Sequence, residues 1–497
     1  MKTIIKYTIC LIAVASMASC KKWLDITPQS QVSLDDLYKT PEGFEEALNG
    51  VYIRCAQSDI YGDELSCGFL DVMAQDYTTS ALNDALGYTQ TQRFNYQDAN
   101  FMKHRDSAWG GLYNAIVNTN LILSNIDAKK NIFKGNEYSL IKGEALALRG
   151  FLHFDLFRMF GSSLNSPQPT TGIPYVTKYT NTVTAMNTPA EVMFNILADL
   201  NGAKDLLKTS DPILSNTYVI AYPNSDSSTE ASNDSLFLQN RRYRLNYFAV
   251  CGELARVYLY QNDKTNALAN AKEVIDSKKF PWTAQADFLN TDAKTKDPIL
   301  YKELLFSWYC PWETKHLHDR FLNNTSGLYL SQADAQYLYE TNGVGGEDFR
   351  YKQWLTINSS GNMELQKYAR NAAYLGTDND QSYNLYPQAI PSLRLSEMYY
   401  IAAEASYDAN PTSAIDYLNK VRNARGIGAS VTANTKSDFT NELLKDARKE
   451  LLGEGQIFYM YKRLYHNIVG QNGAVTVASD KIFTLPLPVN EIQFGNR

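Results

Sequence analysis

The chain has 497 residues, of which 44% are hydrophobic and 20% are charged, and its formal net charge is −6 at pH 7. This length allows a large hydrophobic core, and the composition is that of a globular protein. The acidic net charge argues against a nucleic-acid ligand, because no basic run elsewhere reverses it. Tyrosine is abundant, at 34 residues, which favours surfaces that are apolar and still form hydrogen bonds.

The N-terminus has the pattern of a bacterial export signal. Two lysines precede an apolar run and small residues that end at Cys20. A signal of this kind is removed on export and is too short to be a membrane span. The sequence Met-Ala-Ser-Cys at 17–20 is similar to a lipobox, in which the cysteine is lipidated. We therefore expect a lipoprotein signal peptide at 1–19 and a lipid-anchored tether at 20–39, with Cys20 as the lipid attachment site and the only contact with the membrane.

The longest helical pattern spans Glu137–Phe160 and ends before Gly161, with apolar residues around most of its circumference. Such a helix must be buried on several sides, and we expect it to be the central element of the fold. Other helices are predicted by apolar spacing and by capping sequences such as Thr40-Pro41 and the box that begins at Thr188. These predicted helices cover 40–54, 101–126, 188–207, 244–260, 263–277, 393–407, 411–425 and 437–465.

Several of these helices pair into hairpins that resemble tetratricopeptide units. The hairpins do not recur at the fixed period of a tandem array, because long segments separate them. We expect 61–101 to be an exposed excursion, and 280–391 to be the main aromatic-rich insertion, with strands at 301–308 and 349–357. The predicted fold class is mostly α: a tetratricopeptide-like helical hairpin scaffold with long loop-rich insertions containing a few short β-strands, in a single domain at 40–497.

Short motifs follow one another behind the lipobox, each weak alone and specific in combination. They are Trp23-Leu24-Asp25, Tyr113-Asn114-Ala115-Ile116, Gly143-Glu144-Ala145, Ala255-Arg256-Val257-Tyr258, Asp348-Phe349-Arg350, Arg394-Leu395-Ser396-Glu397 and Arg448-Lys449-Glu450-Leu451. In this order they resemble the SusD-like (RagB/SusD) family of outer-membrane nutrient-binding lipoproteins of Bacteroidetes. The resemblance covers nearly the whole mature chain.

The resemblance implies a surface-exposed lipoprotein of the outer membrane that binds a glycan, either an oligosaccharide or a polysaccharide. It implies that the glycan is delivered to a SusC-like TonB-dependent transporter, and that the protein has no chemistry and no nucleic-acid partner of its own. No cofactor is implied, and whether a calcium ion binds stays open. Two alternatives also stay open: the same architecture with a peptide, glycopeptide or other non-glycan cargo, and a tetratricopeptide-type scaffold that binds only proteins.

Catalysis is disfavoured by the sequence. It has no nucleophile motif and no glycine-rich phosphate loop. Glu450 and Glu454 lie one helical turn apart, but Arg448 and Lys449 stand beside them. We therefore interpret these carboxylates as parts of a paired helix terminus and not as a general acid and base. The expected protein is not an enzyme.

Carbohydrate binding requires flat aromatic faces surrounded by groups that bind hydroxyls. Two stretches outside the predicted scaffold supply both, one around Trp308–Trp312 and one between residues 76 and 88. The candidate ligand-binding residues are Trp308, Trp312, Tyr77, Tyr88, Asp76, Asn83, His318 and Arg320.

The histidines and cysteines are expected to have structural roles. His316 and His318 form a small cluster that would share one face of a strand, but a zinc site usually needs more ligands, and we expect no metal site. His153 falls in the predicted central helix and is expected to be a hydrogen-bonded core residue. Cys55 and Cys67 are the only close pair in the mature body; they could form a disulfide, or be small hydrophobic residues in a large core.

Overall fold

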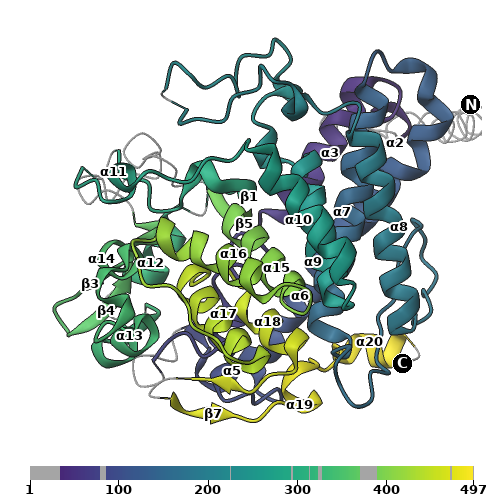
Figure 1. Ribbon diagram of the computed structural model, residues 1–497. Helices are drawn as coiled ribbons and strands as arrows, with labels where there is room; N and C mark the ends of the chain where they lie inside the picture. Colours follow the sequence, from purple (N-terminus) through teal and green to yellow (C-terminus); the bar gives the residue numbers. More distant parts are fainter. Residues whose placement is uncertain are drawn as a thin grey trace, which may run out of the picture.

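Helices dominate the part of the chain that the computed structural model describes, which is residues 34–78, 86–223, 225–292, 295–312, 314–322, 327–369, 389–470 and 473–495. The expected mostly α fold with a few short strands is confirmed (Figure 1). The expected signal peptide, the expected lipid attachment site Cys20 and the candidate Asn83 lie outside the described residues.

The helices of the N-terminal half include the central helix α7, as expected. These helices are α2 (Leu34–Leu37), α3 (Pro41–Cys55), α4 (Phe69–Met73), α5 (Thr89–Gln92), α6 (Ala99–Ile126), α7 (Glu137–Phe160) and α8 (Pro189–Leu207). Helix α7 has the predicted bounds and packs against α6 on one side and α8 on the other. Helix α8 begins with the predicted capping box, in which Thr188 Oγ1 accepts from the Glu191 amide and the Glu191 carboxylate accepts from the Thr188 amide. The periodic apolar pattern and the caps therefore determine this half of the scaffold.

The scaffold continues through hairpins that lie side by side in the centre of Figure 1. They are formed by α9 (Tyr247–Tyr260) with α10 (Lys264–Ser277), and by α15 (Leu395–Ser406) with α16 (Pro411–Ala424). Helix α10 also packs against α15, so the two hairpins form one layer. Helices α17 (Lys436–Glu450), α18 (Ile457–Leu464), α19 (Asp480–Phe483) and α20 (Val489–Phe494) complete the chain.

Short strands and helices form the insertion. Strand β1 (Leu304–Tyr309) pairs antiparallel with β5 (Ala389–Arg394). A second sheet has the strand order β2 (Tyr329–Ser331), β4 (Asn362–Leu365), β3 (Leu355–Ile357). Outside the insertion, β6 (Ile468–Val469) pairs with β7 (Val475–Thr476). The helices of the insertion are α11 (Gln285–Phe288), α12 (Thr314–Leu322), α13 (Gln332–Tyr339) and α14 (Phe349–Trp354). Short 3₁₀ helices are η3 (Asp127–Ile132), η4 (Pro212–Leu214), η5 (Leu236–Leu238), η6 (Arg241–Tyr243), η7 (Tyr301–Glu303), η8 (Val344–Glu347) and η9 (Gln366–Tyr368).

The expectation that 61–101 is an exposed excursion is wrong for the first part of that segment. Residues 60–74 are buried throughout. Their polar side chains are tolerated inside because each finds a partner elsewhere in the chain. Asp63 pairs with Arg320, and Asp71 accepts a hydrogen bond of 2.7 Å from the amide of Gly455. Because these partners are distant in sequence, the local pattern of polar and apolar residues does not reveal that the segment is buried.

The predicted helix at 437–465 is two helices, α17 and α18. Gly453 and Gly455 separate them with φ angles of +77° and +67°. A side chain at Gly455 would also place its Cβ 2.1 Å from the carbonyl oxygen of Leu65. Only glycine combines this backbone conformation with so close an approach.

Two further boundaries differ from the prediction. Of the segment predicted as a strand at 349–357, only β3 is extended, because Asp348 caps α14 by accepting from the amide of Arg350. The segment predicted as a helix from 393 begins as the end of β5 and turns helical at Leu395. In both places a strand and a helix follow each other without a loop, so their apolar patterns merge.

The cysteines behave as small core residues. Cys55, Cys67, Cys251 and Cys310 are free and buried, so the possible Cys55–Cys67 disulfide is not formed. Within the described ranges, no helix is both long and apolar enough to cross a membrane.

Candidate functional site

Trp308 belongs to the core, so the expectation that it offers a face to a ligand is wrong. Its side chain is 1% exposed and stacks on Tyr61 with ring centroids 4.4 Å apart. Phe306 and Phe151 pack edge-on against the same indole. Every residue of β1 except Tyr309 is buried, because the strand is covered on both faces.

Exposed aromatic rings begin where β1 ends. Tyr309 is 44% exposed and Trp312 is 45% exposed. The ring of Tyr309 contacts Tyr243 edge-on at 5.2 Å, which fixes its orientation. We call Tyr309, Trp312 and the following His316 the Trp312 corner. It is the one part of the predicted aromatic surface that the described structure leaves open.

Helix α12 carries His316, the third residue of the Trp312 corner. The prediction that His316 and His318 share a face of a strand is wrong, because both lie in α12, where His316 is exposed and His318 is buried. His316 and Arg320 are one turn apart, and both contact Asp63: His316 Nε2 lies 2.5 Å from Asp63 Oδ2. These contacts hold the N-terminal half of the chain against the insertion.

The ion pair beneath the corner is charged in the folded protein. Burial raises the pKa of Asp63, but Arg320 and His316 outweigh that effect and hold the pKa below its usual value. Arg320 Nη1 also donates to Tyr88 Oη at 2.6 Å, and Tyr88 Oη donates to Glu64 at 2.9 Å. Tyr88 and Arg320 are 0% and 5% exposed. They therefore support the corner and do not line an open surface.

Two further candidates point away from the corner. Tyr77 is 0% exposed and donates to Asp71 Oδ2 at 3.1 Å. Asp76 is 2% exposed and faces Arg448, with Arg448 Nη2 3.3 Å from Asp76 Oδ1. Burial raises the pKa of Asp76 to about 7, although Arg448 opposes the shift. These two residues therefore lie in the interior, and the expectation of an aromatic surface at Tyr77 and Tyr88 is wrong.

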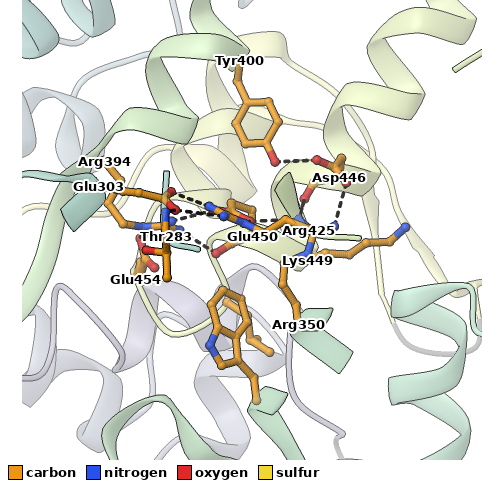
Figure 2. Close-up of polar contacts among 12 residues, drawn as sticks. Thr283, Glu303, Arg350, Arg394, Tyr400, Arg425, Asp446, Lys449, Glu450 and Glu454 are labelled. Atoms are coloured by element: carbon orange, nitrogen blue, oxygen red, sulfur yellow. Dashed lines mark hydrogen bonds and ion pairs between the residues drawn. The ribbon is translucent and has the colours of Figure 1, made fainter. Parts of the chain in front are cut away.

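The Glu450–Glu454 pair is the centre of a buried ion network (Figure 2). Glu450 contacts Arg394 and Arg425, each at 2.6 Å, and Arg350 at 3.0 Å. Glu454 contacts Arg394 at 2.9 Å. Burial raises the pKa of Glu450, but Arg425 and Arg394 outweigh it and hold the pKa well below its usual value. The expected pairing of these carboxylates is confirmed, but their partners are distant arginines, whereas Arg448 and Lys449 pair with Asp76 and Glu340. The expected single helix is wrong, because α17 ends at Glu450 and Glu454 lies beyond it.

His153 is the hydrogen-bonded core residue that the sequence predicts. Its Nδ1 lies 2.9 Å from the carbonyl oxygen of Arg149, and its Nε2 accepts from the amide of Val176 at 2.9 Å. Nδ1 therefore carries the proton of a neutral ring. Burial lowers the pKa of His153 to about 3. Among the described residues, no group of three or more His, Cys, Asp or Glu side chains is arranged to hold a metal ion.

A groove that the sequence analysis did not identify lies between α13, α17 and β6. Its volume is about 650 Å³. The side chains that line it include an exposed tyrosine, Tyr337, and two asparagines, Asn434 and Asn441. The feature of the sequence that could have indicated this groove is Tyr337, an aromatic residue on the polar side of a short helix.

Two family models together match residues 22–495 of the chain. A model described as "Starch-binding associating with outer membrane" matches residues 22–224, and the SusD family model matches residues 214–495. The chain belongs to the SusD family. The resemblance read from the motifs is thereby confirmed.

Curated SusD-family relatives and solved structures agree with this assignment. SusD-like protein P38 of Formosa agariphila is 22% identical, with 90% of this chain and 88% of the relative covered. A putative sugar binding protein from Bacteroides vulgatus is 24% identical, with a TM-score of 0.69 over 91% of this chain and 96% of that one. A laminarin binding SusD-like protein is 17% identical, with a TM-score of 0.61 over 92% of this chain and 98% of that one. At these identities the structures establish a shared fold.

Proposed function

We propose that this SusD-family chain is a cell-surface lipoprotein that binds a glycan at the Trp312 corner and delivers it to a TonB-dependent transporter. The observation that carries the proposal is the pair of exposed rings, Tyr309 and Trp312, at the end of a strand that is otherwise buried. The flat face of an exposed indole suits the apolar side of a sugar ring, and the phenol of Tyr309 adds a second open ring close to it in sequence.

The comparisons support the glycan as cargo. One matching model is described as starch-binding, and one structural neighbour is described as binding laminarin. The same model is described as associating with the outer membrane, which supports the location. Lipidation at Cys20 and delivery to a SusC-like transporter are supported by the lipobox and the motif order of the sequence.

Calorimetry of residues 21–497 tests the glycan site. The titrants are maltoheptaose, laminarihexaose, xylohexaose, cellohexaose and mannohexaose. We expect one of these oligosaccharides to bind, and Trp312→Ala to weaken that binding by about tenfold, which corresponds to about 1.4 kcal/mol. Phe194→Ala is a matched control, because Phe194 is 73% exposed on α8, outside the corner. Equal weakening by both variants, or by neither, would count against the Trp312 corner.

The protein-binding alternative also has one observation in its favour. An apolar groove of about 800 Å³ runs along the start of α8, lined by Leu164, Pro169, Met193, Phe194 and Leu197. A chain that binds only proteins would use this groove and bind no oligosaccharide. Affinity purification of the lipidated chain from its own outer membrane distinguishes the two functions: we expect a TonB-dependent transporter to co-purify, together with binding of an oligosaccharide in the calorimetry.

A further inference from the structure

We propose that the groove between α13 and α17 is a second saccharide-binding site, separate from the Trp312 corner. The inference rests on the proposed function, since it assigns the same class of ligand to a different surface. The groove of about 650 Å³ is within the usual range for small-molecule sites. None of the described residues that line it belongs to β1 or α12. In Figure 1, α13 and α17 lie above the hairpin of β6 and β7.

The groove between α13 and α17 has an aromatic surface. Tyr337 lies on α13, lines the groove and is 49% exposed. The position of its ring is limited on one side, because a Cβ placed on Gly473 would lie 3.3 Å from Tyr337 Oη. Tyr461 also lines the groove and is 1% exposed, so it contributes to the base. An exposed ring above a buried one gives the groove an apolar side on which a sugar ring can stack.

Several charged side chains of the groove are already paired, whereas neutral amides are available. Lys445 donates to Glu442 at 2.8 Å, and Lys449 pairs with Glu340 at 2.5 Å. Asn434 is exposed and has no hydrogen-bond partner among the described residues. Asn441 is exposed, and its one side-chain hydrogen bond within the described part of the chain is to His466, at 3.1 Å. An amide offers both donors and an acceptor, as sugar hydroxyls require.

An arginine at the base of the groove has a nitrogen that its hydrogen bonds to the described residues leave unused. Arg448 lines the groove and is 8% exposed. Its Nε and Nη2 lie 3.4 and 3.3 Å from Asp76 Oδ1, and Nη2 lies 3.5 Å from the carbonyl oxygen of Gln75. None of these hydrogen bonds involves Nη1, and Asp76 Oδ2 is buried without a hydrogen-bond partner among the described residues. A buried guanidinium is normally bonded more fully than this. Hydroxyl oxygens of a saccharide in the groove would accept from it.

These features favour a saccharide over a peptide in the groove. A peptide would need apolar pockets for its side chains or an unpaired strand edge. Leu338, Leu444 and Val469 supply some apolar lining, and β6 is paired on one side only, but most of the lining side chains are polar, with amides and a guanidinium beside one open aromatic ring. It is therefore matched to a ligand that has a flat apolar side and many hydroxyls.

The test is calorimetry of residues 21–497 with the oligosaccharides named above, comparing wild type with Tyr337→Ala, Asn441→Ala, Trp312→Ala and the double variant Tyr337→Ala/Trp312→Ala. We expect wild type to bind two equivalents. Each of Tyr337→Ala and Asn441→Ala should weaken one of the two by about tenfold. Trp312→Ala should affect the other, and the double variant should bind neither. Tyr337→Phe keeps the ring, and its thermal unfolding and that of Tyr337→Ala report whether the fold is intact.

The outcomes separate this inference from the proposed function. If Trp312→Ala abolishes all binding and both groove variants bind as wild type does, the function stands and the second site is refuted. If the groove variants lose binding and Trp312→Ala does not, the groove is the glycan site and the Trp312 corner is refuted. A chain that binds no member of the panel refutes both, and a peptide that binds in a Tyr337-dependent manner assigns the groove to peptides instead.

Discussion

Arg425 and Glu450 form a bidentate ion pair where α16 ends against α17. Arg425 Nε lies 2.9 Å from Glu450 Oε2, and Arg425 Nη2 lies 2.6 Å from Glu450 Oε1. The other Arg425 donor, Nη1, lies 3.0 Å from Glu303 Oε1 at the start of β1. All three side chains are 0% exposed. This pair therefore connects the insertion to the last helices of the scaffold.

Removing one partner of this pair should be strongly destabilising. Glu450→Gln keeps the shape of the side chain but leaves Arg350, Arg394 and Arg425 without their shared carboxylate. We expect the free energy of unfolding to fall by about 3–5 kcal/mol, because uncompensated buried charge is costly. Urea denaturation measures the change.

Glu347→Gln is the control for that variant. Glu347 pairs with Lys352 at 2.7 Å, but its side chain is 80% exposed. An exposed pair of this kind contributes little, and we expect a change within about 0.5 kcal/mol. Equal losses in the two variants would contradict the importance of burial.

The two tryptophans near the insertion should separate stability from binding. Trp308→Ala removes a ring that is 1% exposed, and we expect a loss of about 3–5 kcal/mol in the free energy of unfolding. Trp312→Ala removes a half-exposed ring and should change stability by no more than about 0.5 kcal/mol. Thermal and urea unfolding of both variants check this, and a stability loss at Trp312 comparable to that at Trp308 would contradict the exposed position.

Glycine substitutions should have opposite effects at two positions. Gly455→Ala places a Cβ 2.1 Å from the carbonyl oxygen of Leu65 at a φ of +67°, and we expect a loss of more than about 2 kcal/mol or failure to fold. Gly110→Ala is the matched control in α6, where a Cβ would meet no atom within 4 Å. There we expect a gain of about 0.5–1 kcal/mol. Urea unfolding measures both changes, and a harmless Gly455→Ala would refute the close approach.

His153 should make the protein less stable in acid. Its pKa is lowered to about 3 in the folded state by burial, against about 6.5 in the unfolded chain. Between these two values only the unfolded chain takes up the proton. The free energy of unfolding should therefore fall by about 1.4 kcal/mol for each pH unit as pH decreases from 6.5 towards 3.

His153→Gln isolates this contribution from that of the carboxylates. The variant has no titrating ring, so the difference in free energy of unfolding between wild type and variant should shrink as pH decreases from 7 to 4. Urea denaturation at several pH values provides the comparison. A difference that stays constant over that range would show that His153 is not buried in its neutral form.

The sequence predicts the elements whose signals are local. The bounds of α7 follow from apolar residues around the whole helix, and α8 begins at a capping box that the residues themselves specify. The position of Trp312 beyond the buried part of β1 could also be predicted from a local signal, because the strand predicted at 301–308 ends before it. The mostly α class and the family motifs were also readable, because they depend on short stretches of sequence.

The rest depends on contacts between distant residues. The segment at 61–101 was predicted to be exposed because its aspartates and tyrosines are polar, yet Asp63 is buried with Arg320, 257 residues later. Trp308 is buried by Tyr61, and Tyr77 packs against Phe321, with ring centroids 6.2 Å apart. Composition alone does not distinguish such residues from an exposed aromatic surface, because both combine rings with hydrogen-bonding groups.

The network around Glu450 also affects the order in which the chain can fold. Hairpins such as α9 with α10 are closed by neighbours in sequence and can form early, because little chain entropy is lost. The ion pair of Glu303 needs Arg425, which is 122 residues later in the chain. The ion pair of Arg394 needs Glu450, which is 56 residues later. Until α17 is in place, the insertion carries charged side chains without partners and cannot pack. A chain that ends before Glu450 would therefore lose both the last helices and the ordered insertion that carries the Trp312 corner.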